Sequence, residues 1–406
     1  MDEAVRQYQL DIARAQFSRR RFMTGAALAA TGAALAACGA NGSSSAPSVA
    51  APSVASSAPS TAPTASASAA AASPAASYAL ESEFFLFNWT TYFSPDNKKA
   101  FTDQYGLSNF QEDFYPSNED MLAKLLAGGK GQYDVAVPTA EFVPTLASKG
   151  FLEKLDKSRL PNLANVNPRF LTMIMDPNDD YIVPKDWGTT GIIYRGKDVK
   201  EPVTSWKDFW DLATTKYSGK TLVVDSPGDV FVAPLRMLGF DVNTTDTNEL
   251  EQARVQLMKL RPHLQSIDSD NYPQTLRDEG AVLALAWNGT AYLMQQEAAY
   301  VDTKYTIPSE GTIFWTDTWV LLAEAPHPNI AYTFLNWIQD PHVQVVESLY
   351  AAYASTNDAA KPLLPPEFVN NPAVYVPDDQ LALLSVATDQ SGNKQRADIW
   401  AEFKQG

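Results

Sequence analysis

The sequence predicts an α/β protein with two lobes, each built on a mixed, mostly parallel sheet flanked by helices. Short apolar runs, as at residues 84–88 and 133–137, alternate with helical segments, and this alternation indicates parallel strands joined by helices. The alternation resumes after residue 220. With 406 residues, 45% of them hydrophobic, the chain is long enough for more than one core. A chain that crosses between two such lobes predicts a hinged cleft that closes on a ligand.

Residues 1–37 have the form of an export signal. They contain the twin-arginine signature Ser18-Arg19-Arg20-Arg21-Phe22 and an apolar run too short to span a membrane. The run ends in small residues before Cys38, in the order typical of a bacterial lipobox. We therefore expect export by the twin-arginine route and lipidation of Cys38. Residues 38–78 are a Ser/Ala/Pro-rich tether, which predicts a lipid-anchored module in the periplasm or at the outer face of the cytoplasmic membrane.

The first lobe begins with three predicted strand–helix units. Strands are expected at 84–88, 110–114 and 133–137, and helices at 95–106, 117–126 and 142–149. Ser117 and Asp120 have the spacing of a capping box, which marks the start of the second helix.

The second lobe repeats this pattern. Strands are expected at 181–184, 191–194, 221–225 and 281–286, and a further strand at 318–322 returns to the first lobe. Helices are expected from 205, at 230–238, 250–260, 290–300, 330–338 and 343–350, and in the tail before 403. The expected lobes are 79–187 plus 318–360, and 188–317 plus 361–406.

The composition excludes several classes of protein. A formal net charge of −16 argues against a nucleic-acid partner, and a single cysteine excludes an intrachain disulfide. The three histidines lack metal-ligand spacing, so neither a metal nor a cofactor is expected. Motifs of serine hydrolases, zinc proteases and nucleotide-binding loops are absent from the sequence, so we do not expect an enzyme.

Two tryptophans and one carboxylate form the most informative group. Trp287 precedes Asn288-Gly289, and Trp315-Thr316-Asp317 follows downstream; we expect each of them at a strand end. Indole faces attract organic cations by about 0.5–2 kcal/mol, and a carboxylate adds a charge-assisted hydrogen bond to an ammonium group. Taken alone, both tryptophans would more often be core residues.

Several further stretches, taken together, resemble one known family. They are Phe87-Asn88-Trp89-Thr90-Thr91-Tyr92, Ser117-Asn118-Glu119, Tyr133-Asp134-Val135-Ala136-Val137-Pro138, Asp229-Val230-Phe231, Ser269-Asp270-Asn271, Trp287-Asn288-Gly289, Phe314-Trp315-Thr316-Asp317 and Tyr353-Ala354-Ser355-Thr356-Asn357. In this order they resemble the spermidine/putrescine-binding proteins of bacterial ABC importers. The resemblance implies a type II periplasmic-binding-protein fold, a monomer, a polyamine ligand held between the lobes, and ABC permease subunits as partners.

The resemblance also implies a set of ligand-binding residues. By position, the aromatic box would be Trp89, Tyr92, Trp287, Trp315 and Tyr353. Asp317 and Asp229 would bind amine groups from opposite lobes. Thr90 and Thr139 would offer hydroxyls, and Gln390 would contribute from the tail.

The sequence departs from the family at the far end of this site. Ser226 stands where spermidine-binding members have an acid, and Glu141 stands where they have a tyrosine. Asp225 or Glu141 would supply the missing charge, or the pocket would prefer another amine. Thr290 is uncharged where putrescine-binding relatives have an acid, which favours spermidine.

Two alternatives remain open at this point. In the first, the protein binds another small amine or solute. In the second, it is a sensory module that presents its ligand to a chemoreceptor.

Overall fold

The computed structural model describes residues 78–171, 173 and 175–406. The predicted signal at 1–37, Cys38 and the tether, Tyr78 excepted, lie outside these residues. Within the described residues, no helix combines the length and the apolar composition that crossing a bilayer requires.

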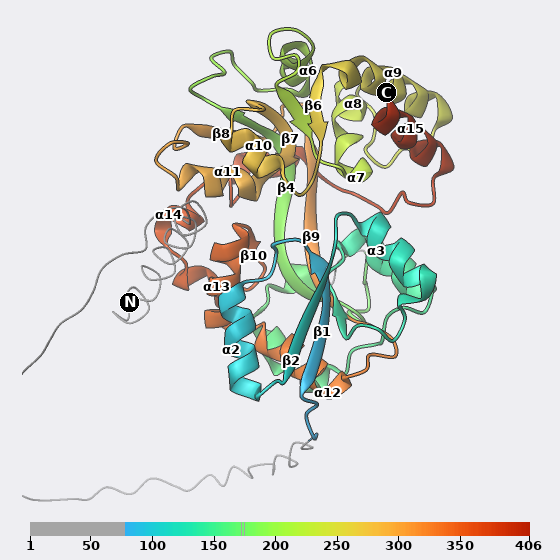
Figure 1. Cartoon of the computed structure of the whole chain (residues 1–406), viewed down its shortest axis with the longest axis vertical. Coiled ribbons are helices and arrows are strands. Elements are labelled where there is room, and N and C mark those ends of the chain that lie inside the picture. Colours follow the sequence, from blue (N-terminus) through green and yellow to red (C-terminus); the bar gives the residue numbers. More distant parts are fainter. Residues whose placement is uncertain (1–77, 172, 174) are drawn as a thin grey trace, which may run out of the picture. The chain divides into compact units, whose positions relative to one another are not determined.

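Eleven strands of the described chain join in one hydrogen-bonded network (Figure 1). The main order is β2-β1-β3-β9-β4-β7-β5-β6, while β8 and β10 pair with β4 and β11 pairs with β9. The strands are β1 (Glu83–Trp89), β2 (Asn109–Tyr115), β3 (Val135–Ala136), β4 (Val183–Arg195), β5 (Thr221–Val223), β6 (Leu264–Ile267), β7 (Leu283–Trp287), β8 (Thr303–Thr306), β9 (Thr312–Leu321), β10 (Ala354–Ser355) and β11 (Leu384–Val386).

The network is mixed, as expected. β1 runs parallel to β2 and β3, and β5 runs parallel to β6 and β7. β4 and β9 are antiparallel neighbours that connect these two parallel groups. Figure 1 shows them side by side along the middle of the described chain.

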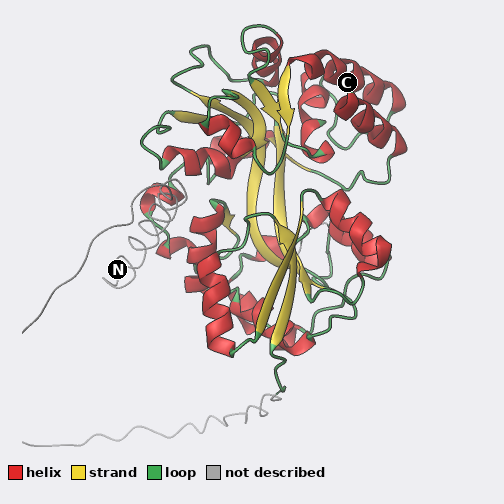
Figure 2. Ribbon diagram, viewed as in Figure 1, coloured by secondary structure: helices red, strands yellow, loops and turns green. Residues whose placement is uncertain are grey.

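Helices flank the strands (Figure 2). The α-helices are α2 (Pro95–Tyr105), α3 (Asn118–Lys124), α4 (Val143–Ser148), α5 (Pro168–Leu171), α6 (Trp206–Thr214), α7 (Pro227–Val230), α8 (Val232–Met237), α9 (Thr247–Leu260), α10 (Tyr272–Arg277), α11 (Asn288–Gln295), α12 (Pro328–Trp337), α13 (Pro341–Ala351), α14 (Pro366–Val369) and α15 (Lys394–Gln405). A π-helical turn, η1 (Leu125–Gly129), extends α3. The 3₁₀ turns are η2 (Ala140–Phe142), η3 (Lys157–Arg159), η4 (Pro161–Asn165), η5 (Arg261–His263), η6 (Lys361–Leu363) and η7 (Asp378–Leu383).

Side-chain caps define where several helices begin. The Ser117 hydroxyl accepts a hydrogen bond from the Asp120 amide at 3.1 Å and donates one to its carboxylate at 2.8 Å, which confirms the predicted helix start at Ser117. Ser94 caps α2 directly before Pro95, a residue suited to the first helical position. These caps fix where the chain leaves β1 and β2, and so where the residues between strand and helix lie.

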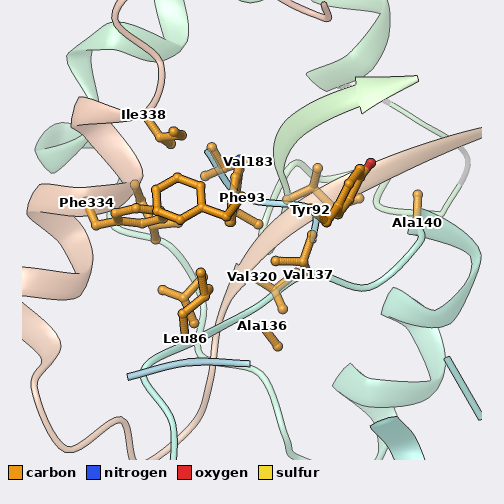
Figure 3. Packing of buried hydrophobic residues seen from close by; sticks show 14 of the residues in the cluster. Leu86, Tyr92, Phe93, Ala136, Val137, Ala140, Val183, Val320, Phe334 and Ile338 are labelled. Atoms are coloured by element: carbon orange, nitrogen blue, oxygen red, sulfur yellow. The ribbon is translucent and has the colours of Figure 1, made fainter. Parts of the chain in front are cut away.

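Buried hydrophobic side chains form two clusters. One contains Phe84, Trp319 and Phe334 among others, and the second contains Trp206, Phe231 and Leu257. β4 contributes to both clusters, since its residues 183 and 187 belong to the first and its residues 192 and 193 to the second. Figure 3 shows part of the first cluster, in which the hydroxyl of Tyr92 points away from the rings of Phe93 and Phe334.

Two expectations about the strands were wrong. The expected strands at 181–184 and 191–194 are parts of one strand, β4, which begins at Val183, and the strand expected at 318–322 begins earlier, at Thr312, as β9. Trp315 and Asp317 therefore lie inside a strand and not at its end, whereas Trp287 does end β7. The reason is that β4 pairs with β9 across this whole stretch, so the threonines and Asp317 are held in the ladder although they are polar.

Candidate functional site

The candidate site lies where β4 and β9 run next to each other. Their antiparallel register places Asp186 opposite Asp317 and Gly188 opposite Trp315. An isolated bridge joins Asp317 to Thr139, which follows β3. Three chain segments far apart in the sequence therefore meet around Asp317.

Three aromatic rings surround this point. The Trp315 and Tyr353 rings meet edge to face with centroids 4.8 Å apart, and the Tyr353 and Tyr92 rings do so at 5.9 Å. Two glycines permit this packing. A Cβ on Gly188 would lie 2.5 Å from the Trp315 ring, and a Cβ on Gly289 would lie 2.6 Å from the Tyr353 ring. The absence of these side chains thus sets the positions of both rings.

A second aromatic pair comes from the ends of β1 and β7. The Trp89 and Trp287 rings meet edge to face at 6.3 Å, and Tyr272 packs on Trp287 at 6.0 Å. The indole nitrogen of Trp89 donates to the carbonyl of Val137 at 2.8 Å, which fixes the orientation of its ring. Both tryptophans are only partly buried, so part of each ring faces out of the core.

Asp317 is a buried carboxylate that is only half satisfied. Its side chain is among the buried groups at 6% exposure, and its Oδ2 lies 2.7 Å from the Tyr92 hydroxyl. Its Oδ1 has no partner with hydrogen-bond geometry among the described residues. Burial, followed by the nearby charge of Asp186, raises the pKa of Asp317 to about 7, and the neighbouring hydroxyls of Tyr92 and Thr139 oppose this rise only in part. A buried carboxylate oxygen without a donor is costly, so this position favours a ligand that brings donors and positive charge.

A buried ion network lies behind Tyr92. The Lys185 ammonium, 0% exposed, lies 2.7 Å from Asp186 and 3.2 Å from Glu347, and 3.6 Å from the centroid of the Tyr92 ring. Burial opposes its charge, but Asp186 and Glu347 more than offset this and raise the pKa of Lys185. The amide groups of Asn97 and Ser94 donate to Glu347. The network holds Asp186 beside the Tyr92 hydroxyl, at 2.5 Å.

Further carboxyl groups gather beyond Asp317. Burial raises the pKa of Glu141 well above its usual range, and the negative charges of Asp317, Asp229 and Glu119 raise it further. Burial likewise raises the pKa of Glu119 to about 7, with contributions from Asp229 and Asp389. Burial also raises the pKa of Asp229, although Thr190 donates a hydrogen bond to it. A bound cation would lower the pKa of each of these carboxyl groups. The group of Glu119, Glu141 and Asp229 therefore favours a positively charged ligand.

The structure brings most of the predicted residues together. Tyr92, Thr139, Trp315, Asp317 and Tyr353 are linked around Asp317 by the contacts above. Trp89 pairs with Trp287, and the charges of Glu141 and Asp229 interact with each other.

Two predicted residues lie apart from these groups. Thr90 is exposed, and the side-chain amide of Gln390 donates to Thr388 at 2.8 Å. The residue directly before Gln390, Asp389, does act on the acidic group. Its negative charge helps to raise the pKa of Glu119, and its carboxylate accepts a hydrogen bond from Thr145.

Lys185, Asp186, Glu119 and Asp389 were not predicted as site residues. For Lys185 and Asp186 a signal existed, since two adjacent charges interrupt the otherwise apolar and aromatic run from Ile182 to Trp187. Such charges inside a buried strand require partners.

A fold of this kind, with aromatic rings and a half-satisfied carboxylate at the meeting point of its strands, is that of a solute-binding protein. The chain belongs to the family of bacterial extracellular solute-binding proteins, which matches residues 98–376. It is therefore a binding protein and not an enzyme.

Two relatives of the chain are named for the polyamines that they bind. The spermidine/putrescine-binding periplasmic protein of Escherichia coli is 38% identical over 296 residues, which cover 72% of this chain and 82% of the relative. A putrescine-binding periplasmic protein of the same organism is 32% identical over 339 residues, covering 79% and 91%.

A solved structure gives the same result for the fold. A spermidine/putrescine ABC transporter protein of Listeria monocytogenes superposes with a TM-score of 0.75 at 27% identity, over 80% of this chain and 99% of that one. The type II periplasmic-binding-protein fold and the family resemblance expected from the sequence are both confirmed.

Proposed function

We propose that this protein captures a polyamine, spermidine in preference to putrescine, between two lobes and delivers it to an ABC import permease. The observation that carries the proposal is the Oδ1 of Asp317, which has no hydrogen-bond partner among the residues that the structure describes and is buried near the rings of Tyr92, Trp315 and Tyr353. An alkylammonium group supplies the donors and the charge that this oxygen lacks. Its methylenes would bury against the rings, at about 0.8 kcal/mol for each CH₂.

The lobes of this proposal are residues 79–187 with 318–360 and residues 188–317 with 361–406. Asp317, the last residue of the second set before 318, would bind one amine where it pairs with Asp186 and Thr139 of the first set, and Asp229 would bind a second amine from the second set. The two hydrophobic clusters support a division into two lobes, because each end of β4 and β9 carries its own core and the two ends could close around a ligand.

The preference for spermidine rests on the acids beyond Asp317. Asp225 forms an ion pair with Lys404 at 2.6 Å, which leaves Glu141 as the better replacement for the charge missing at Ser226. Thr290, the uncharged residue that favours spermidine over putrescine, is buried, and its hydroxyl lies 2.6 Å from that of Tyr272. We infer that Glu141, with Glu119 beside it, serves a further amine of a triamine.

The proposal extends to the cell envelope. Export through a twin-arginine signal and lipidation of Cys38 would keep the binding protein, acting as a monomer, next to its permease. Globomycin-type inhibition of lipoprotein processing, followed by fractionation, tests the anchor; a protein that stays soluble in untreated cells would contradict it.

Calorimetric titration of the purified protein tests the function itself. Spermidine, putrescine and spermine are the probes, and glycine betaine and maltose are the controls. We expect heat of binding with polyamines and none with maltose. Absence of binding to every polyamine would refute the proposal.

A further inference from the structure

We propose that Asp186 is a further residue of the ammonium site: through the Tyr92 hydroxyl it shares one proton with Asp317, and an alkylammonium group that binds Asp317 displaces this proton. The inference rests on the proposed function, since it takes an alkylammonium as the ligand of Asp317. It makes Asp186 a positioning residue, because it acts on the ligand through Tyr92 and Asp317.

The Tyr92 hydroxyl contacts two carboxyl groups, those of Asp186 and Asp317. Its Oη lies 2.5 Å from Oδ1 of Asp186 and 2.7 Å from Oδ2 of Asp317, so these two carboxylate oxygens are at most 5.2 Å apart. A phenol has one proton and can donate to only one of them, and an ionised carboxylate can only accept. The second short contact therefore requires a proton on one of the two carboxyl groups.

The surroundings decide which carboxyl group carries the proton. Oδ2 of Asp186 accepts a hydrogen bond from the Lys185 ammonium at 2.7 Å, a contact with a cation that none of the described residues makes with Asp317. Oδ1 of Asp317 has no partner with hydrogen-bond geometry among the described residues. Tyr92, Thr139 and Lys185 lower the pKa of Asp317 less than burial and the charge of Asp186 raise it. The raised pKa of Asp317, about 7 through burial and the charge of Asp186, agrees with this assignment.

The remaining titratable groups around Asp317 do not replace Asp186 in this role. Tyr115, Tyr353 and Glu141 face it from β2, from the residue before β10 and from η2, and burial is the first cause that raises the pKa of each. They therefore favour their neutral forms. Glu347 on α13 is held by Lys185 and by the donors of Asn97 and Ser94.

The exchange of proton for ammonium balances in charge. Lys185, Asp186, Glu347 and protonated Asp317 together carry a net charge of −1. When an R–NH₃⁺ group binds, the carboxyl O–H bond of Asp317 breaks, its proton passes to solvent, and the carboxylate accepts hydrogen bonds from the ammonium. The buried group again carries −1, so the ligand enters without adding charge to the interior.

The test measures proton release on binding of putrescine to the whole protein. Putrescine has only primary amines, which like the lysine side chain keep their protons well above pH 8. Titrations at pH 6 and pH 8, each in two buffers of different ionisation enthalpy, give the number of protons released. For the wild type we expect roughly one more proton released at pH 6 than at pH 8, and an affinity about tenfold weaker at pH 6.

The variant Asp186→Asn separates this pair from the other acids. It should release fewer protons than the wild type at pH 6, and its affinity should depend less on pH, because the charge of Asp186 no longer raises the pKa of Asp317. Glu119 and Glu141 are unchanged in both proteins, so the difference reports the Asp186–Asp317 pair. Asp398→Asn, which removes an exposed carboxylate paired with Lys394, should behave like the wild type.

Each outcome decides the inference. Equal proton release by wild type and Asp186→Asn, or a wild-type affinity independent of pH, would overturn it while leaving polyamine binding intact. Absence of polyamine binding at both pH values would overturn the proposed function as well. Should Asp186→Asn not fold, Asp186→Ser also removes the carboxylate and should lower the proton release at pH 6; an unchanged release would refute the inference.

Discussion

Replacement of Asp317 by asparagine should weaken ligand binding and at the same time stabilise the unliganded protein. The affinity effect follows from the loss of a charge-assisted hydrogen bond, worth roughly 1.5–3 kcal/mol. At about 1.4 kcal/mol for each factor of ten, spermidine should bind roughly ten to a hundred times more weakly.

The stability effect has the opposite sign. The pKa of Asp317 rises from 3.8 to about 7 in the folded chain, so the folded state holds its proton more tightly than the unfolded state. Its contribution to stability is present below about pH 4 and is lost as the pH rises toward 7. Above pH 7 the buried charge destabilises the unliganded fold by about 4 kcal/mol, because each tenfold change in proton affinity corresponds to about 1.36 kcal/mol. Asparagine carries no charge and removes this penalty.

Urea denaturation of the unliganded proteins at pH 4 and pH 8, together with calorimetric titration, measures both effects. We expect Asp317→Asn to be more stable than the wild type at pH 8 and the difference to shrink at pH 4. Asp398→Asn is the control for removing a carboxylate from the surface. A variant less stable than the wild type at pH 8, or one with unchanged spermidine affinity, would refute the reasoning.

Three further changes test other parts of the site. Lys185→Met leaves two buried carboxylates without their cation and should lower the free energy of unfolding, measured by urea denaturation, by about 3–5 kcal/mol. The control Lys394→Met, at an exposed position, should change it by less than about 0.5 kcal/mol. Equal effects of the two variants would contradict the buried network. Trp89→Ala should weaken spermidine binding about tenfold, through lost ring contact and cation–π attraction, while Trp400→Ala on α15 should leave the measured affinity unchanged. Glu141→Gln should weaken spermidine binding at least about fivefold and putrescine binding less than about twofold, because Glu141 is assigned to the third amine; equal losses for the two ligands would contradict that role.

Local features of this fold could be predicted from the sequence. The Ser117 cap depends on residues three positions apart, and Trp287 ends an apolar run directly before Asn-Gly, so both are visible in short windows. Trp287, Trp315 and Asp317 were recognised because their types suit an ammonium ligand, whereas the other predicted site residues came from the family resemblance.

Contacts that depend on register could not be predicted in this way. Tyr92 and Asp317 are 225 residues apart, and they meet because β1 pairs with β3 and β3 with β9, while the register of β4 on β9 brings Asp186 opposite Asp317. The same register makes β9 continuous, although its threonines and Asp317 are typical of a strand exit. Gln390 was expected from a loose match in the tail, where a shift of one residue separates it from Asp389.

The continuity of β4 has a consequence for the cooperativity of unfolding. The strand supplies Val183 and Trp187 to one hydrophobic cluster and Ile192 and Ile193 to the other, without a linker between them. Because one continuous strand carries side chains of both clusters, we expect the two clusters to unfold in a single cooperative transition.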